Sequence, residues 1–417
     1  MRFVAALVFV MALLAPATAR ATTLASVVTE VGDGLGAGIP SGALVVAAPL
    51  ETDVAPVAGR ADELALRFGA LLAGRFTGAH AAARVASLDD ARAMAARATR
   101  LVYVRVQIVK GQLRVTADAY PVVRNVWDRA RLPPPPPNGH AYAAAPIDAE
   151  VRAFFPPIPL AMTNVVKATG ADADVLAVAC GDLDGDGAPE ILLVSRERVA
   201  LARIASGKVV VARTAPWSAL GKRAPVPLRE PLGGAAIEVG RAFVGSSDRG
   251  GFEIGEALDA PRALSGGLPI GADMCAPIST SRLAFEGVVP CSGNASRGAR
   301  ESYDAASAFD LVTPDGRDRL ALATTEGGKL SLRVDGIERA TFDEAGAQVV
   351  VFDADLDGAP EIAFGSDAPE DFLTIATLGE RGPRVLSRIP AAAGVRALGA
   401  CGGALVAVVG TEVWLVR

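Results

Sequence analysis

Two short acidic stretches share one pattern, and this pattern restricts the fold more than any other feature of the sequence. They read DLDGDGAPE at 182–190 and DADLDGAPE at 353–361, so each has carboxylates at positions 1, 3, 5 and 9 and a glycine at position 6. Asp and Gly favour tight turns, and a short apolar run directly after such a turn predicts a β-strand. We therefore expect the same acidic turn to lead into a strand at two places.

The alternating carboxylates suit a hard cation. Calcium takes about six to eight oxygen ligands at roughly 2.3–2.6 Å. An EF-hand loop would need a glutamate at position 12, followed by a helix. Position 12 is Leu193 in the first stretch and Phe364 in the second, and both lie in strand-like runs. The sequence predicts a calcium loop between strands; the alternative is an acidic surface turn without an ion.

This arrangement resembles the FG-GAP (VCBS-type) repeat of integrin-α-like β-propellers. The resemblance implies one calcium ion in each loop, so two in the chain, held by the side chains at positions 1, 3, 5 and 9 and by the backbone carbonyl at position 7. The implied ligands are Asp182, Asp184, Asp186, the carbonyl of Ala188 and Glu190, and, in the second loop, Asp353, Asp355, Asp357, the carbonyl of Ala359 and Glu361. The family often has aspartate at position 9, so glutamate adds one methylene there.

The chain from about residue 164 onward is repetitive. Short apolar strands end in a small residue at Ser195, Ser246, Gly287, Thr324, Ser366 and Gly410. Their spacing averages about 43 residues, which is the length of one four-stranded propeller blade. The fold class expected is therefore mainly β, with a C-terminal β-propeller at 164–417 that has six blades, or seven if a weak unit is hidden.

The last unit ends one strand short of a full blade. The missing outer strand is expected from residues 164–169, which would join the two ends of the ring and remove an exposed sheet edge.

Four cysteines allow three pairings, and sequence alone does not choose among them. We hypothesise a Cys180–Cys401 bond, because both residues end the first strand of their units and ring closure makes those strands neighbours. Cys275 and Cys291 flank a strand of the third unit, so a bond between them would bridge that unit. The alternative is four buried free thiols.

The N-terminal part divides by composition into four segments. Residues 1–21 read as a cleavable signal peptide, with a charged start, an apolar run and small residues at a cleavage site. Residues 22–40 read as a glycine-rich linker, 41–125 as a small α/β domain of order β-α-β-α-β-β, and 126–163 as a connector stiffened by the prolines at 133–137. This order loosely resembles the N-terminal domain of TolB, a protein in which such an α/β domain is followed by a six-bladed propeller.

Composition and motifs narrow the function classes. A net charge of −5 argues against a nucleic-acid partner. No segment after the signal peptide is apolar enough to span a membrane, so none is expected in the mature chain. Only two histidines occur, His80 and His140, and no GxSxG, HExxH or Walker motif is present.

The hypothesis that follows is a non-enzymatic, calcium-stabilised propeller, exported to the periplasm or the cell exterior. Its partner would be a protein or glycan of the cell envelope. One alternative is a glycan lyase or hydrolase with its site at the mouth of the propeller. Another assigns binding to the α/β domain, with the propeller as a platform, as the TolB resemblance implies.

Overall fold

A computed structural model describes residues 22–123, 125, 127, 131, 133–222, 231–238, 240–271, 273–279, 284–293, 301–368, 370–379 and 382–417. The predicted signal peptide lies outside these residues. The chain divides into two compact units, Met1–Pro157 with Val312–Asp318, and Ile158–Leu311 with Arg319–Arg417. Among the helices in the described residues, none is long and apolar enough to cross a membrane.

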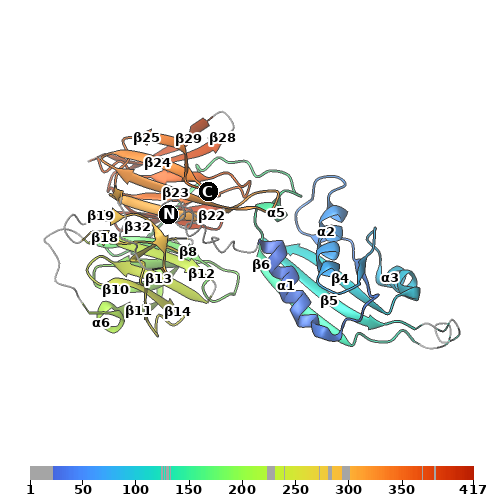
Figure 1. Cartoon of the computed structure of the whole chain (residues 1–417). Coiled ribbons are helices and arrows are strands. Elements are labelled where there is room, and N and C mark those ends of the chain that lie inside the picture. Colours follow the sequence, from blue (N-terminus) through green and yellow to red (C-terminus); the bar gives the residue numbers. More distant parts are fainter. Residues whose placement is uncertain are drawn as a thin grey trace, which may run out of the picture. The chain divides into compact units, whose positions relative to one another are not determined.

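The first unit is one mixed sheet with helices on both faces (Figure 1). Its strands are β1 (Leu44–Ala47), β2 (Glu51–Thr52), β3 (His80–Ala81), β4 (Arg100–Val109), β5 (Gln112–Pro121) and β6 (Gly139–Pro146). Strand β1 pairs in parallel with β3 and β4, and β4, β5 and β6 form an antiparallel run. Helix α2 (Ala61–Gly74) comes before β3 and helix α3 (Leu88–Met94) before β4, in the order that the sequence predicts, and the two lie on opposite faces of the sheet.

Residues 22–40 are not the linker that their glycines suggested. They form helix α1 (Thr23–Leu35) and a short 3-10 turn at Gly36–Gly38, and the Thr22 side chain accepts a hydrogen bond from the N–H of Ala25. The buried residues of α1 recur at helical spacing: Leu24, Val27, Val28, Val31 and Leu35. Burying this apolar face outweighs the roughly 1 kcal/mol that a helical glycine costs. A Cβ on Gly34 would lie 3.0 Å from the Cβ of Ala141, so this glycine allows α1 to approach β6 closely.

The expected connector at 126–163 is also partly wrong. Strand β6 and the short helix α5 (Ala149–Arg152) lie within it, and both contribute buried residues to the core that α1 covers. The α/β unit therefore extends beyond residue 125. The prolines at 133–137 do lie outside regular secondary structure, between β5 and β6.

The second unit is a series of antiparallel sheets taken in chain order. Three of these sheets have four consecutive strands each. The first is β12 (Gly233–Glu238), β13 (Arg241–Ser246), β14 (Gly250–Gly255) and β15 (Arg262–Ala263). The second is β22 (Ala305–Val312), β23 (Asp318–Glu326), β24 (Lys329–Val334) and β25 (Ile337–Asp343), and the third is β26 (Val349–Phe352), β27 (Glu361–Phe364), β28 (Asp371–Gly379) and β29 (Gly382–Ala391). Two small three-stranded sheets lie between the first and second of these. One is β16 (Leu268–Gly271), β17 (Met274–Ala276) and β20 (Val289–Pro290), and the other is β18 (Ile278–Ser279), β19 (Ala284–Glu286) and β21 (Ser302–Tyr303).

The ends of the series share one eight-stranded sheet, in the order β30-β31-β32-β7-β11-β10-β9-β8. Its first-blade strands are β8 (Val175–Gly181), β9 (Glu190–Ser195), β10 (Arg198–Ala205) and β11 (Lys208–Pro216), after which comes the short helix α6 (Trp217–Leu220). Its last-blade strands are β30 (Val395–Cys401), β31 (Ala404–Val409) and β32 (Glu412–Val416), completed by β7 (Val165–Thr169).

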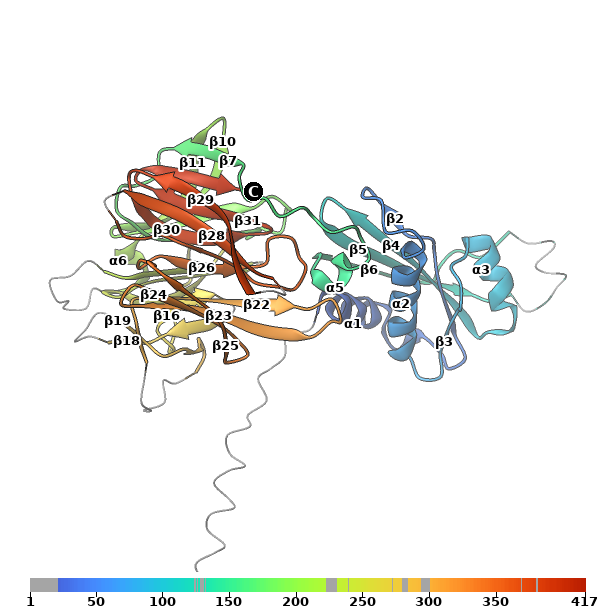
Figure 2. The ribbon, with the colours of Figure 1, turned by 90° about the horizontal axis from the view of Figure 1, so that it is seen from above.

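Strand β7 closes the ring as the sequence predicts. It pairs antiparallel with β32 over five residues, from Val165 opposite Val416 to Thr169 opposite Glu412. It also touches the first blade through Thr169 opposite Lys208 of β11, and Figure 2 shows β7 beside β11 and the C-terminal strands. This closure and the succession of antiparallel sheets confirm a mainly β fold with a β-propeller. Six units result if the two small sheets are halves of one blade; the blade count stays a prediction.

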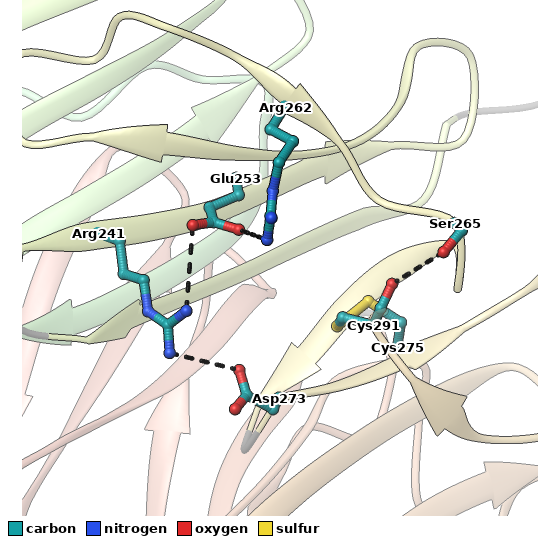
Figure 3. Close-up of a disulfide and its surroundings, with 7 residues drawn as sticks. All are labelled: Arg241, Glu253, Arg262, Ser265, Asp273, Cys275 and Cys291. Atoms are coloured by element: carbon teal, nitrogen blue, oxygen red, sulfur yellow. Dashed lines mark hydrogen bonds and ion pairs between the residues drawn. A yellow bond between two sulfur atoms is a disulfide. The ribbon is translucent and has the colours of Figure 1, made fainter. Parts of the chain in front are cut away.

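The cysteines form the two bonds hypothesised from the sequence. Cys180–Cys401 joins β8 to β30, the two outermost strands of the eight-stranded sheet, with Cα atoms 4.7 Å apart. Cys275–Cys291 has Cα atoms 4.8 Å apart, and the carbonyl of Cys291 accepts a 3.4 Å hydrogen bond from the Ser265 hydroxyl (Figure 3). Nearby, Arg241 lies 4.0 Å from both Glu253 and Asp273, and Arg262 pairs with Glu253.

Removing the two disulfides should have unequal effects on stability. The Cys180–Cys401 bond spans 221 residues and the Cys275–Cys291 bond spans 16. If chain entropy dominates, Cys180→Ser/Cys401→Ser should lower the free energy of unfolding by about 5 kcal/mol, and Cys275→Ser/Cys291→Ser by about 3. Urea unfolding of both variants without reductant measures this difference. An equal or smaller loss for the 180/401 variant would contradict the closing role.

Candidate metal centres

The two acidic loops share three internal hydrogen bonds; a fourth, from the N–H at position 5, goes to Asp184 in the first loop and to Asp353 in the second. In each, the N–H at position 2 donates to the glutamate at position 9, the N–H at position 6 to the aspartate at position 1, and the N–H at position 7 to the aspartate at position 5. The pairs are Leu183–Glu190 2.8 Å, Gly187–Asp182 2.9 Å and Ala188–Asp186 2.7 Å; and Ala354–Glu361 2.7 Å, Gly358–Asp353 3.0 Å and Ala359–Asp357 2.7 Å. The backbone therefore fixes one oxygen of each of these carboxylates.

The sharp bend in each loop needs left-handed backbone. At position 6, Gly187 has φ +85° and Gly358 has φ +82°, a region that glycine enters without a steric cost. At position 4 the first loop has Gly185 at φ +74°, whereas the second has Leu356 at φ +56°. A leucine there costs on the order of 1 kcal/mol or more, so the second loop keeps its shape against a local penalty.

The folded loops each gather three of the four predicted ligand side chains; Asp186 in the first loop and Glu361 in the second are not part of these groups. In the first, Asp182, Asp184 and Glu190 each offer an oxygen within 4.8 Å of the others; in the second, Asp353, Asp355 and Asp357 do so. Each loop also has one buried carboxylate oxygen without a hydrogen-bond partner, Oδ1 of Asp182 and Oδ1 of Asp355. Leaving such an oxygen unsatisfied costs about 1–3 kcal/mol, and an oxygen-seeking cation would satisfy it.

A positive side chain enters the first loop. The guanidinium of Arg203, on β10, donates from Nη2 to Asp184 (3.1 Å) and Asp186 (2.9 Å), and from Nε to Glu190 (2.8 Å). The hydrogen bonds to Glu190 and then to Asp186 hold the pKa of Arg203 above its ordinary value. The pKa of Asp186 is lowered, first by the hydrogen bond from the N–H of Ala188 and then by Arg203. The first loop is thus an internal ion-pair cluster.

The second loop has a neutral residue at the corresponding place. The hydroxyl of Thr377, on β28, donates to Glu361 at 2.7 Å. Among the described residues, no arginine or lysine forms an ion pair with Asp353, Asp355, Asp357 or Glu361. Two of these carboxyls are almost fully buried, Asp353 at 5% exposure and Glu361 at 1%.

Burial without a positive partner disfavours charge in the second loop. It raises the pKa of Asp353 to about 7, with Asp357 and Asp355 adding like-charge repulsion. Burial likewise raises the pKa of Glu361 to about 8, and it raises the pKa of Asp355. A divalent cation would neutralise this charge and reverse these shifts. The donor set and the missing counter-charge therefore fit calcium in the second loop.

Sequence reasoning missed Arg203 and Thr377, although a signal was present. Strands β9 and β10 pair with Val194 opposite Val199 and Ile191 opposite Ala202, so Arg203 comes next to Glu190. A two-residue hairpin turn at 196–197 fixes which residues of the two strands pair, so the sequence could have predicted that Arg203 lies beside Glu190. In the second loop, Glu361 lies directly opposite Thr377.

One further polar cluster lies in the first unit. His140 on β6 has Nδ1 2.7 Å from Oδ1 of the buried Asp118, and Arg105 lies 3.3 Å from the other oxygen of that carboxylate. The His140 side chain is 63% exposed. The cluster links β4, β5 and β6 through their side chains.

Comparisons with known proteins give only distant likenesses. No protein-family model and no curated protein matches the sequence. Among solved structures, the WD40 repeats of RRP9 share 13% identity with a TM-score of 0.39, over 63% of this chain and 99% of that chain. AofleA from Arthrobotrys oligospora shares 12% at 0.37, over 61% and 87%. YCF48 bound to D1 peptide shares 12% at 0.32, over 63% and 96%. Similarity at this level does not extend to ligand or activity.

Stability of the calcium-free protein should fall as pH rises from about 5 to 8. The raised pKa values of Asp353 and Glu361 mean that the folded state retains protons that the unfolded chain releases in this range. Each such proton contributes up to about 1.4 kcal/mol per pH unit. Urea unfolding in chelator at several pH values gives the slope.

Glu361→Gln should make this slope shallower. Asp343→Asn, which removes an exposed carboxylate at the end of β25, is the control and should leave it unchanged. A slope of opposite sign in the unmodified protein, or the same slope in Glu361→Gln, would contradict the assignment.

Proposed function

We propose that this chain is an exported β-propeller module, stabilised by calcium in its second acidic loop, that binds a protein or glycan partner of the cell envelope. The observation that carries the proposal is the cluster of buried, uncompensated carboxylates at 353–361 within a closed propeller. In this proposal the protein binds a partner and does not catalyse a reaction, and the ion stabilises its fold.

The second loop connects β26 to β27, two paired strands whose residues are all buried. Asp353, Asp355, Asp357 and Glu361 would hold the ion, with the carbonyl of Ala359 as a backbone ligand. The ion would supply positive charge and a fixed coordination shell. An ion held there would tie the loop to the core of its sheet, so binding and folding would be coupled.

The closed ring supports a binding role. Pairing of β7 with β32 removes the open edge that the last sheet would otherwise expose, so the loops between strands are held by a rigid frame. The two disulfides agree with an oxidising compartment outside the cytoplasm. A rigid, ion-stabilised propeller would hold these loops in fixed positions for binding a partner in such a compartment.

Calcium should raise the melting temperature of the purified protein relative to chelator. A ligand that binds only the folded state adds about 2.7 kcal/mol at a hundredfold excess over its Kd. Asp355→Asn keeps the side-chain shape but removes charge from the loop, so it should abolish most of the calcium-dependent rise. Asp343→Asn should retain the rise. An equal calcium response in Asp355→Asn would refute the second loop as the site.

Expression of the full chain in a bacterial host with a secretion pathway should yield protein outside the cytoplasm. Cleavage after Ala19 or Ala21 would leave a mature N-terminus at Arg20 or Thr22. N-terminal sequencing of the fractionated protein identifies the site. Recovery of cytoplasmic protein that still begins with Met1 would contradict export.

A further inference from the structure

We propose that the first loop does not bind calcium because Arg203 takes the place of the ion, so the chain holds one calcium rather than two. This inference rests on the proposed calcium site in the second loop. It departs from the symmetry of the sequence, in which the two loops have identical residues at positions 1, 3, 5 and 9.

The guanidinium is bonded to three of the four carboxylates that an ion would use. It meets side chains at positions 3, 5 and 9, through Asp184, Asp186 and Glu190. Its five N–H donors form a planar fork suited to several carboxylates, and arginine stays protonated at any pH a protein tolerates. The first loop thus has a permanent internal cation.

Calcium could enter only by displacing this cation. Glu190 is 2% exposed, so its carboxylate is shielded from solvent and depends on Arg203 for neutralisation. An ion beside a retained Arg203 would meet a like charge at close range, and an ion that expelled Arg203 would have to break all three of its ion pairs. In the second loop none of these ion pairs exists among the described residues, and Thr377 offers only a hydroxyl.

The strand register makes Arg203 and Thr377 equivalent. Ile191 lies opposite Ala202, so Glu190, at position 9 of the first loop, comes opposite Arg203. In the second loop Ile362 lies opposite Ala376, and Glu361, at position 9, lies opposite Thr377. The loops also differ at positions 2 and 4, but the cross-strand residue is the one that adds a positive charge to the first loop, so exchanging it should exchange their calcium binding.

The test is the number of calcium ions bound per chain, measured by equilibrium dialysis of metal-stripped protein at neutral pH. The unmodified protein should bind one ion, Arg203→Thr two, and Thr377→Arg none. Arg198→Thr is the matched control: it removes an arginine of the same strand that pairs with Asp172 outside the loop, and it should still bind one. If Arg203→Thr does not fold, as judged by circular dichroism, Arg203→Gln removes the charge while keeping a hydrogen-bonding side chain.

The outcomes separate this inference from the proposed function. Two ions in the unmodified protein, or one ion in a folded Arg203→Thr or Arg203→Gln, would overturn the inference and leave the second loop as a site. No ion in the unmodified protein and one in Arg203→Thr would support the inference and refute calcium in the second loop. No ion in either protein would overturn both.

Discussion

The pairing of β7 with β32 is the contact on which the rest of the propeller depends. Five residue pairs join the first strand of this unit to its last, and a single further pair links β7 to the first blade. Without them the last blade would lack its outer strand and expose a row of unpaired backbone groups. With them, β8 and β30 come within disulfide distance, and the sheets between are confined to a closed ring.

The two acidic loops have the same carboxylates at the same positions but different electrostatic surroundings. They share three backbone-to-carboxylate hydrogen bonds, and both bring three carboxylate oxygens close together. Their electrostatics nevertheless diverge, since one cluster faces a guanidinium and the other a hydroxyl. In the first loop the cost of burying carboxylates is therefore offset by Arg203, whereas in the second loop no positive side chain of the described residues offsets it.

Much of the fold could be read from the sequence because it repeats. Strands β9 and β13 end at Ser195 and Ser246 as expected, and ring closure by residues near 164–169 followed from the incomplete last unit. Residues 22–40 differ from the expected linker because burial of the apolar face from Leu24 to Leu35 outweighs the flexibility of their glycines. The difference between the loops depends on a cross-strand neighbour, which the loop motif itself does not contain.

Ring closure by the two ends of the unit has a consequence for assembly. Strand β7 is the first strand of the propeller to be synthesised and its partner β32 is the last, so the edge of β7 stays unpaired while the sheets between them form. During that wait, β32 of a second copy offers the same five pairs in the same register. At high concentration during refolding, the chain should therefore be prone to exchange its closing strand between copies, and Cys180 of one copy could then bond to Cys401 of another and trap the pair.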